Sequence, residues 1–433
     1  MKITALASKI VQDVRASYWF IPTLMVFAAI ALAFITEAMD HAGWSDVLPR
    51  RLRDTQADPA RALLSVIAQS FIGVVGVMFS VTMVAVSFAS SNFGPRLIGN
   101  FMRDRANQTS LGILIATFVY TILILRAVQD PSGEDASFVV EEFVPHLSIL
   151  TAIVLALISV LTVIYYVHHI PEAINIANIT SGLGNRLVAA IAHDRGVPSD
   201  SGSTWPEGLE TQDIHAGGAG YVQTFSFATL DGVARDHDAW VEVLRMPGDF
   251  VDEKMPVLRV VGGPVLDDEM REKYRTCFAL GEGRTENQNM MFMISQLCEI
   301  VARALSPGIN DPFTAINCMN WLHVGLRLAL DDPPDRMAGR FDRLSMPPIT
   351  FGDLFREAHL TTRPYIAADQ NAAVHVLGLL GELADRCAPG PRRSLIEAEF
   401  RATRDLALRL QPDPVSQAVL MDAVRDAWPD FDG

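Results

Sequence analysis

The order of apolar and polar positions divides the chain into an apolar first part and a mixed second part. Four long apolar runs occupy residues 18–36, a stretch within 62–89, 111–126 and 147–168. A helix needs about 20 mostly apolar residues to cross the hydrocarbon core of a bilayer. The pattern therefore predicts a domain of four transmembrane helices over residues 1–170.

After the last apolar run the pattern changes to shorter elements. Residues 171–210 are predicted to form a connecting helix and a linker rich in Ser, Gly and Pro. Strand-like runs at 221–227, 240–244 and 257–261, with a short helix between the first two, predict a small β module over 211–265.

Helical periodicity dominates the remainder, so residues 266–433 are predicted to be mainly helical. Apolar positions recur at helical spacing over 290–305, and Pro307 and Gly308 end that helix. Asp311 and Pro312 are typical of the start of a second helix, and three more follow from Asp369. The predicted fold is an α-helical integral membrane domain followed by a cytoplasmic α+β domain, with a small β module and a helical layer.

The second apolar run carries small and polar residues at three- and four-residue spacing, on one side of a helix. They are Gln69, Gly73, Gly76, Ser80, Ser87 and Ser91. One interpretation is a seam where helices pack closely, because small residues let backbones approach in lipid. The other is the lining of a pore in a homo-oligomer, which could gate by dewetting in its apolar middle.

Apart from Arg126 at the end of the third run, the four runs contain no Asp, Glu, Lys or Arg. Asp40 is placed in the first loop. Proton-coupled transporters and redox pumps usually need a charged group inside the membrane. This absence disfavours those classes.

Charge and cysteine content favour a cytoplasmic second half of the chain. Residues 1–200 hold 13 basic and 15 acidic residues, net −2, whereas 201–433 hold 22 and 35, net −13. An acidic body disfavours binding of nucleic acid. The purely acidic loop at 130–145 and the four scattered cysteines, typical of a reducing compartment, agree with two cytoplasmic termini.

Several motifs resemble one family. They are "FSVTMVAVSFASSNFGPRLIGNFMRD", "GYVQ", "LRMPGDFV" and "GRTENQN…ARALSPGINDPFTAINCMNWL". They are similar to the predicted bacterial membrane proteins of domain-of-unknown-function family 2254. The resemblance implies four transmembrane helices and a cytoplasmic domain, and it implies no established activity. Its Arg-Thr-x-x-Gln-Asp pattern is matched by Arg284, Thr285 and Gln288, but Asn289 replaces the acid.

The last of these motifs holds a second candidate group of polar residues, near two helix ends. It comprises Arg284, Thr285, Gln288, Asn289, Arg303, Ser306, Asn310 and Asp311. Such residues either cap helices and tie loops or bind a small ligand or anion. The sequence contains no nucleophile–base pair, phosphate loop or metal-ligand cluster, so we expect no enzyme, no cofactor and no metal.

Two functions remain. The first is a homo-oligomeric, channel-like conductance with a cytoplasmic regulatory domain. The second is a membrane-anchored sensor or scaffold whose soluble domain binds a partner or metabolite. Both expect the lipid bilayer and other copies of the chain as partners, with a small ligand or ion left unidentified.

Overall fold

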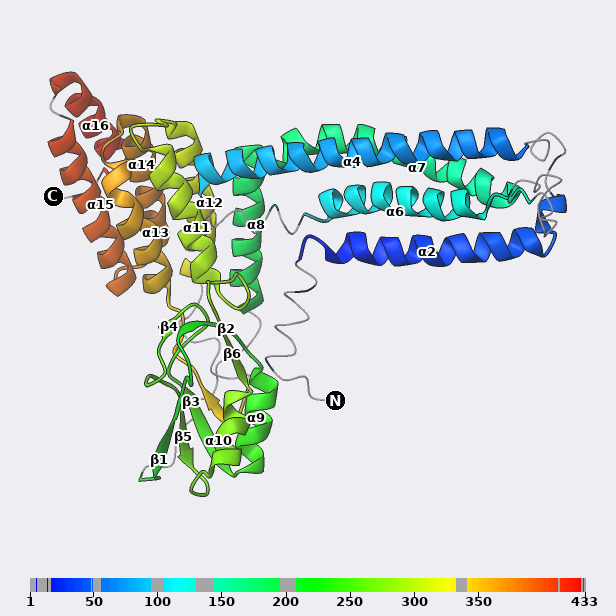
Figure 1. Cartoon of the computed structure of the whole chain (residues 1–433). Coiled ribbons are helices and arrows are strands. Elements are labelled where there is room, and N and C mark those ends of the chain that lie inside the picture. Colours follow the sequence, from blue (N-terminus) through cyan, green and yellow to red (C-terminus); the bar gives the residue numbers. More distant parts are fainter. Residues whose placement is uncertain are drawn as a thin grey trace, which may run out of the picture. The chain divides into compact units, whose positions relative to one another are not determined.

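The structure is a computed structural model of the whole chain (Figure 1). It describes residues 5, 14, 17–47, 49, 56–94, 101, 104–129, 143–194, 208–331, 341–411, 413–429 and 431. Two compact units form. The span unit comprises Asp13–Ser91 and Pro95–Asn175, and the α/β unit comprises Met1–Gln12, Asn92–Gly94 and Ile176–Gly433.

Four helices of the span unit are long and apolar enough to cross a membrane, as the sequence predicted. They are α2 (Phe20–His41), α4 (Ala57–Phe93), α6 (Arg105–Ala127) and α7 (His146–Ala173), and a short 3-10 helix, η1 (Trp44–Val47), follows α2. Each of the four long helices begins before or ends after the apolar run that predicted it. In particular, α2 continues to His41, so Asp40 belongs to its last turn and is not in a loop.

Helix α6 is the centre of the span unit. Its apolar window is 56% buried, whereas those of α2, α4 and α7 are 22–28% buried. Gly112 of α6 lies so close to α2 that an added Cβ would be 2.5 Å from Met25 Sδ. Helix α4 packs on α6 and α7 through Ile67, Phe71, Met78 and Ala85.

The predicted connecting helix is α8 (Ile176–Asp194), which packs on the α/β unit. Gly184 leaves room for the ring of Trp321, because an added Cβ would be 2.3 Å from Trp321 Cδ2. Asn317 Nδ2 donates to Thr180 Oγ1 over 2.8 Å. These contacts fix α8 against α12 (Pro312–Leu330).

The β module contains two sheets. The first has the order β1-β5-β3-β7, and the second the order β4-β2-β6. The strands are β1 (Thr211–His215), β2 (Gly220–Phe225), β3 (Ala239–Val243), β4 (Phe250–Val251), β5 (Pro256–Gly262), β6 (Phe278–Gly281) and β7 (Leu344–Ser345), with helices α9 (Phe227–Asp236) and α10 (Asp268–Arg275). All pairs are antiparallel except β3 with β7. The predicted range 211–265 thus holds β1 to β5, and β6 and β7 come from later positions.

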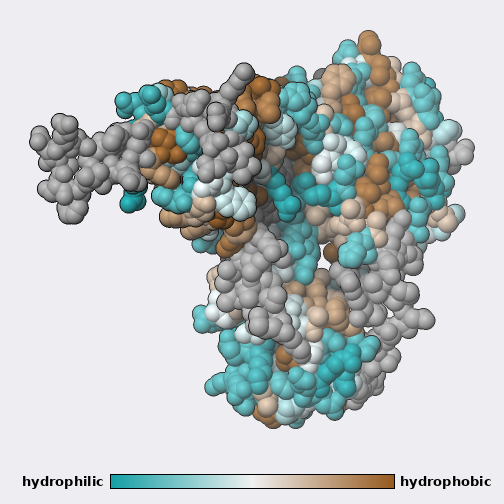
Figure 2. All heavy atoms as spheres, turned by 90° about the vertical axis from the view of Figure 1, so that its right-hand side faces the viewer, coloured by the Kyte–Doolittle hydropathy of each residue, from teal (hydrophilic) through white to brown (hydrophobic). Residues whose placement is uncertain are grey.

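The inner residues of the β module alternate with outer ones, as in strand β3, where Ala239, Val241 and Val243 are buried. The surface is mostly hydrophilic over the β module, at the bottom of the face in Figure 2. The sheets therefore enclose a core of their own, which also takes Phe225, Leu258 and other apolar side chains.

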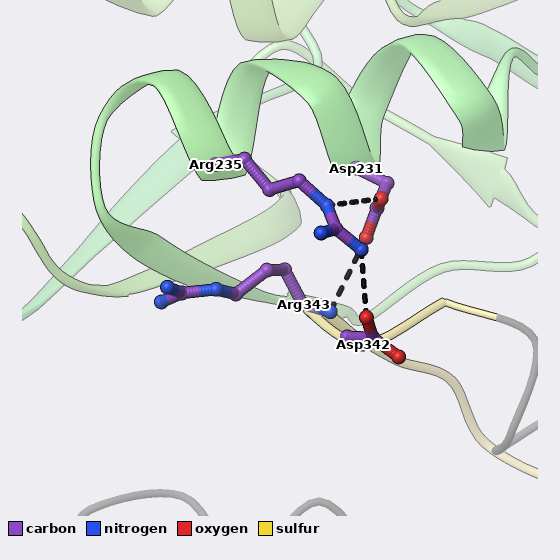
Figure 3. A network of polar contacts seen from close by, with 4 residues as sticks. All are labelled: Asp231, Arg235, Asp342 and Arg343. Atoms are coloured by element: carbon purple, nitrogen blue, oxygen red, sulfur yellow. Dashed lines mark hydrogen bonds and ion pairs between the residues drawn. The ribbon is translucent and has the colours of Figure 1, made fainter.

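A polar network ties the distant segment before β7 to α9 (Figure 3). Arg235 Nε donates to Asp231 Oδ2 over 2.8 Å, and its NH2 group donates to Asp342 over the same distance. The backbone N–H of Arg343 donates to Asp231 Oδ1. Asp231 thus holds α9 and the β7 segment together.

Helices α11 to α16 form a layer beside the sheets (Figure 1). They are α11 (Met290–Ala304), α12, α13 (Phe351–Ile366), α14 (Gln370–Arg386), α15 (Pro391–Leu410) and α16 (Pro414–Ala427). The predicted helices are present, with α13 in addition. Helix α11 was expected to bury one face, but residues 292–298 are all buried because α8, α12 and α13 surround it.

Several predictions fall outside the described residues. They concern most of the acidic loop at 130–145 and the linker at 196–207. The orientation of the chain in a membrane therefore stays a prediction.

Candidate functional site

The polar stripe of α4 lies on the side of the helix that faces away from its own bundle. Gln69, Gly73, Gly76, Ser80, Ser87 and Ser91 are all exposed. A helix turns by about 100° per residue, so a residue nine positions later, two and a half revolutions on, lies on the opposite side. Gly73, Ser80 and Ser87 each follow a buried residue by nine positions, namely Leu64, Phe71 and Met78. The packed face and the stripe are therefore opposite each other.

The stripe is polar, and its glycines and serines give it small side chains. Apart from the nearby backbone of α4 itself, no atom of the described residues lies within 4 Å of a Cβ built at Gly73 or Gly76. Ser80 Oγ donates to the carbonyl oxygen of Gly76 over 2.9 Å, and Ser91 Oγ to that of Ser87 over 3.0 Å. These hydroxyls bond to their own helix, as serines in membrane helices often do. Among the described residues, the stripe thus does not pack against another span of the same chain.

Other polar groups of the spans are used inside the bundle. Thr82, off the stripe, is buried and bonds to the hydroxyl of Tyr166 over 2.5 Å, and Tyr166 donates to the carbonyl of Met78 over 2.8 Å. Thr117 and Ser159 bond to each other over 2.8 Å. Buried polar groups in a bundle need such partners, since lipid offers none. The polar groups left exposed on α4 stand out against this background.

Asp40 caps a helix other than its own. Helix α7 has Pro145 at its N-cap, which offers no side-chain bond. Instead the Asp40 carboxylate accepts from the N–H groups of Leu147 and Ser148 over 2.9 Å each, and from Ser148 Oγ over 2.7 Å. Asp40 was predicted to lie in the first loop and was not among the candidate residues. Its spacing from the buried Ala29, Ala33 and Thr36 on one face of α2 could have indicated it.

A second acid, Asp104, holds the opposite end of the bundle. It caps α6 by accepting from Ala106 N over 3.0 Å, and its other oxygen lies 2.5 Å from His169 Nε2 of α7. Asp104 therefore ties the start of α6 to the end of α7.

The second candidate group is divided between the two ends of α11. At the start, Asn289 Oδ1 accepts from Phe292 N over 3.0 Å and acts as the N-cap. Gln288 has a φ of 53° and bonds twice to the backbone of Phe225, over 2.9 and 3.0 Å. Arg284 is exposed over the ring of Tyr221, and Thr285 is half-buried beside it in sequence. Asn289 thus fills a capping position, for which Asn and Asp are equally suited.

The other members lie at the far end of α11. Ser306 Oγ donates to the carbonyl of Arg303 over 2.6 Å, and Asn310 has a φ of 50° in the turn. Asp311 accepts from Thr314 N over 3.1 Å and from Thr314 Oγ1 over 2.6 Å, as the predicted N-cap of α12. The 15 residues of α11 place the two halves about 22 Å apart. The structure does not bring Arg284 and Arg303 into one site.

Buried titratable groups occur in the helical layer. Burial lowers the pKa of His359 to about 3, with smaller contributions from His323 and Arg363. Burial raises the pKa of the Cys298 and Cys318 thiols, which keeps them protonated. Within the described ranges, no group of three or more His, Cys, Asp and Glu is arranged to hold a metal ion.

The chain resembles known sequences over almost its whole length. It is 25% identical over 434 residues to uncharacterized proteins of Mycobacterium bovis and of two strains of Mycobacterium tuberculosis, covering 96% of this chain and 81% of theirs. No solved structure matches it. The model of a family described as "Predicted membrane protein (DUF2254)" matches residues 15–382. The chain therefore belongs to the DUF2254 family of predicted membrane proteins, as its motifs indicated.

Proposed function

We propose that the protein is a homo-oligomeric, channel-like conductance in which α4 of each copy turns its polar stripe toward the assembly axis. One observation carries the proposal. The stripe is exposed along its whole length and lies opposite the face that packs on α6 and α7. In a bilayer such a face meets lipid, another chain or water.

Contact with another copy suits this face better than contact with lipid. Glycine and serine let helix backbones approach closely, and the amide of Gln69 can bond across a helix interface. Gly73, Ser80 and Ser87 also follow each other at intervals of seven residues. A seven-residue repeat keeps the same face toward neighbouring parallel helices that supercoil with a left hand.

The assembly conducts ions if the α4 helices surround an open path along the axis and do not pack together to fill it. Hydroxyls and backbone near Ser80 and Ser87 would line the path, while the apolar stretch at 74–79 would narrow it. An uncharged, partly apolar constriction can gate by dewetting. In this proposal the acidic α/β unit lies in the cytoplasm of the bacterial cell, as the charge pattern favours.

Cysteine substitutions test the arrangement. The four native thiols are buried, so new ones report with little background. We expect Ser80→Cys to form a cross-linked dimer under mild oxidant in membranes. Val81→Cys is the matched control, because Val81 is 42% exposed but lies about 100° around the helix. Equal cross-linking of the two variants, or none at Ser80, contradicts the assembly.

Ion flux then separates conductance from scaffold. Purified protein in liposomes should pass ions, and Ser80→Leu should reduce the flux by about tenfold or more while cross-linking at Ser87→Cys persists. Assembly without flux from the native chain leaves the alternative, a membrane-anchored sensor or scaffold, in its place.

A further inference from the structure

Hydroxyl side chains make up much of the buried face of α7. Four of the seven buried residues of this helix carry a hydroxyl group, namely Ser148, Ser159, Thr162 and Tyr166. The buried hydroxyls of the neighbouring α6 belong to Ser110, Thr117, Tyr120 and Thr121. A buried hydroxyl costs free energy unless it is hydrogen-bonded, and apolar residues would pack two helices without that cost. The row of hydroxyls therefore indicates a role beyond packing.

Hydrogen bonds connect these hydroxyls at two levels of the span unit. At the start of α7, Ser148 Oγ donates to the Asp40 carboxylate over 2.7 Å, and the hydroxyl of Tyr120 donates to the carbonyl oxygen of the same Ser148 over 3.1 Å. In the middle, Thr117 and Ser159 bond to each other over 2.8 Å, and both are 0% exposed. Polar groups thus join α6 to α7 at both levels.

Similar links occur at the end of α7. The hydroxyl oxygens of Tyr166 and Thr82 lie 2.5 Å apart. His169 follows Tyr166 by three positions, and its Nε2 lies 2.5 Å from Asp104 Oδ2. The side chains of His169 and Asp104 are 21% and 23% exposed, so this pair is partly accessible from outside the bundle. An acid therefore stands at each end of the row, Asp40 at one and Asp104 at the other.

The remaining steps along the row are each one helical turn. On α6, Tyr120 follows Thr117 by three positions. On α7, intervals of three, four and three positions separate Ser159, Thr162, Tyr166 and His169. Side chains three or four positions apart lie on one side of a helix, with Cβ atoms about 5–6 Å apart. One water molecule can bridge two polar groups at such a separation.

Together these residues form a hydroxyl file, in the order Asp40, Ser148, Tyr120, Thr117, Ser159, Thr162, Tyr166, His169 and Asp104. Ser148 and His169 lie 21 positions apart on α7, which is about 32 Å of helix. The hydrocarbon core of a bilayer is about 30 Å thick. The hydroxyl file is therefore long enough to connect the two faces of a membrane.

We propose that the hydroxyl file conducts protons across the membrane through each copy of the chain. A proton that reaches Asp40 is passed from oxygen to oxygen, and water completes the steps of one turn. At each hydroxyl a new O–H bond forms on one side and the existing O–H bond breaks on the other. One proton leaves from the His169–Asp104 pair for each proton taken up at Asp40. The proton gradient drives the transfer, and no other reactant is needed.

A proton suits the hydroxyl file better than a metal ion. It moves along hydrogen bonds between relay groups and needs no open lumen. Divalent cations require about six oxygen ligands. The hydroxyls of Thr117 and Ser159 are fully buried and bonded to each other, which suits transfer along the bond and not passage of an ion between them.

The position of Asp40 changes the argument about charge in the spans. The sequence argued against proton-coupled classes because it placed Asp40 in a loop and no other acid inside the spans. In the structure Asp40 is buried in the last turn of α2, so that argument does not hold at this end of the bundle.

The test measures acidification of liposomes that contain the full chain and an internal pH-sensitive dye. A potassium gradient with valinomycin sets the membrane potential. Ser80→Leu serves as the parent, because it closes the proposed pore at the α4 stripe and leaves the hydroxyl file intact. Thr117→Val removes one hydroxyl of the file and keeps the shape of the side chain, whereas Thr117→Ser keeps the hydroxyl. Thr23→Val makes the same change on α2, outside the file.

We expect the parent to acidify faster than protein-free liposomes. Thr117→Val should slow acidification by at least about tenfold, because transfer stops where a relay group is missing. Thr117→Ser should lose less than Thr117→Val, and Thr23→Val should keep the rate of the parent. Acidification no faster than in protein-free liposomes, an unchanged rate in Thr117→Val, or equal losses in the two Thr117 variants overturns the proposal.

A second position covers the case in which Thr117→Val does not fold. Melting in detergent shows whether each variant keeps the stability of the parent. If Thr117→Val does not, Thr162→Val decides in its place, with Thr162→Ser as its matched variant. The same loss is expected there, and an unchanged rate or equal losses in the two Thr162 variants contradicts the hydroxyl file.

Potassium flux, measured without valinomycin, tests the proposed pore separately, because the hydroxyl file lies within one copy and does not rest on the proposed function. Proton flux that depends on Thr117, without potassium flux from the native chain, removes the pore and keeps the file. Potassium flux that depends on Ser80, with proton flux that does not depend on Thr117, removes the file and keeps the pore.

Discussion

Helix α7 of the span unit and several helices of the α/β unit are capped at their starts in different ways. In the α/β unit a residue next to the helix is the cap: Asn289, Asp311, Thr350, Asp369 and Asp413 each bond to the N–H three positions later. In the span unit, α6 has a local cap in Asp104, but α7 depends on Asp40, which lies 107 positions before Leu147. A local cap is made by the helix itself, whereas the cap on α7 exists only when the bundle is assembled.

The largest effect is expected at Asp40. Asp40→Ala removes the acceptor of three hydrogen bonds and leaves buried donors of α7 without partners, so the free energy of unfolding should fall by about 3 kcal/mol. Thermal unfolding of the full chain in detergent measures it. Asp40→Asn keeps one acceptor oxygen and should lose less. A loss below that of the local caps would remove the contrast between the two kinds of cap.

Acid should weaken the α/β unit through His359. Its pKa, lowered by burial to about 3, lies below the ordinary value of 6.5, so the unfolded chain binds the proton between these values. Stability is therefore full above pH 6.5 and falls by up to about 1.4 kcal/mol per pH unit below it. We expect about 2 kcal/mol lost between pH 6.5 and 5. Melting curves of the native chain and His359→Gln should diverge, with a smaller loss in the variant.

A local cap should matter less than the distant one. Asp311→Ala removes the bond to Thr314 N and should cost about 1 kcal/mol. Hydrogen exchange of the first turn of α12 should rise, while exchange of α7 stays unchanged. Asp311→Asn, which keeps an acceptor, is the control, and an effect that spread to the span unit would argue against local capping.

The smallest effect is expected where this chain departs from its family's pattern. Asn289→Asp restores the acid and should change stability by less than about 0.5 kcal/mol, because both residues cap helices well. Asn289→Ala should cost about 1 kcal/mol in the same melting experiment. A large gain from Asp would show that the charge has a role beyond capping.

The sequence predicted the features that depend on neighbouring residues. Apolar length identified the four spans, and Asp311 with Pro312 identified the start of α12. It also identified the members of the α4 stripe, but it could not say which side of the helix faces the bundle. That depends on the packing of Phe71 and Met78 against other helices.

Features that depend on partners far away in the sequence were not predicted, because a local pattern does not show which distant residues meet. Strand β7 has only two residues, and it pairs with β3 about 100 positions earlier. Asp40 looked like a loop residue because its partners come from α7. The eight residues near α11 are close in sequence, yet the length of α11 separates them into two groups in space.

Because Gly184 has no side chain, Trp321 packs against the backbone of α8, and its fluorescence can report this contact. The indole of Trp321 occupies the space that a larger side chain at position 184 would need. Position 184 is on α8, the helix that directly follows α7. The emission of the indole depends on whether the peptide backbone or water is its neighbour. In a variant with the other five tryptophans replaced, the emission wavelength of Trp321 would show whether α8 is packed on α12 or separated from it.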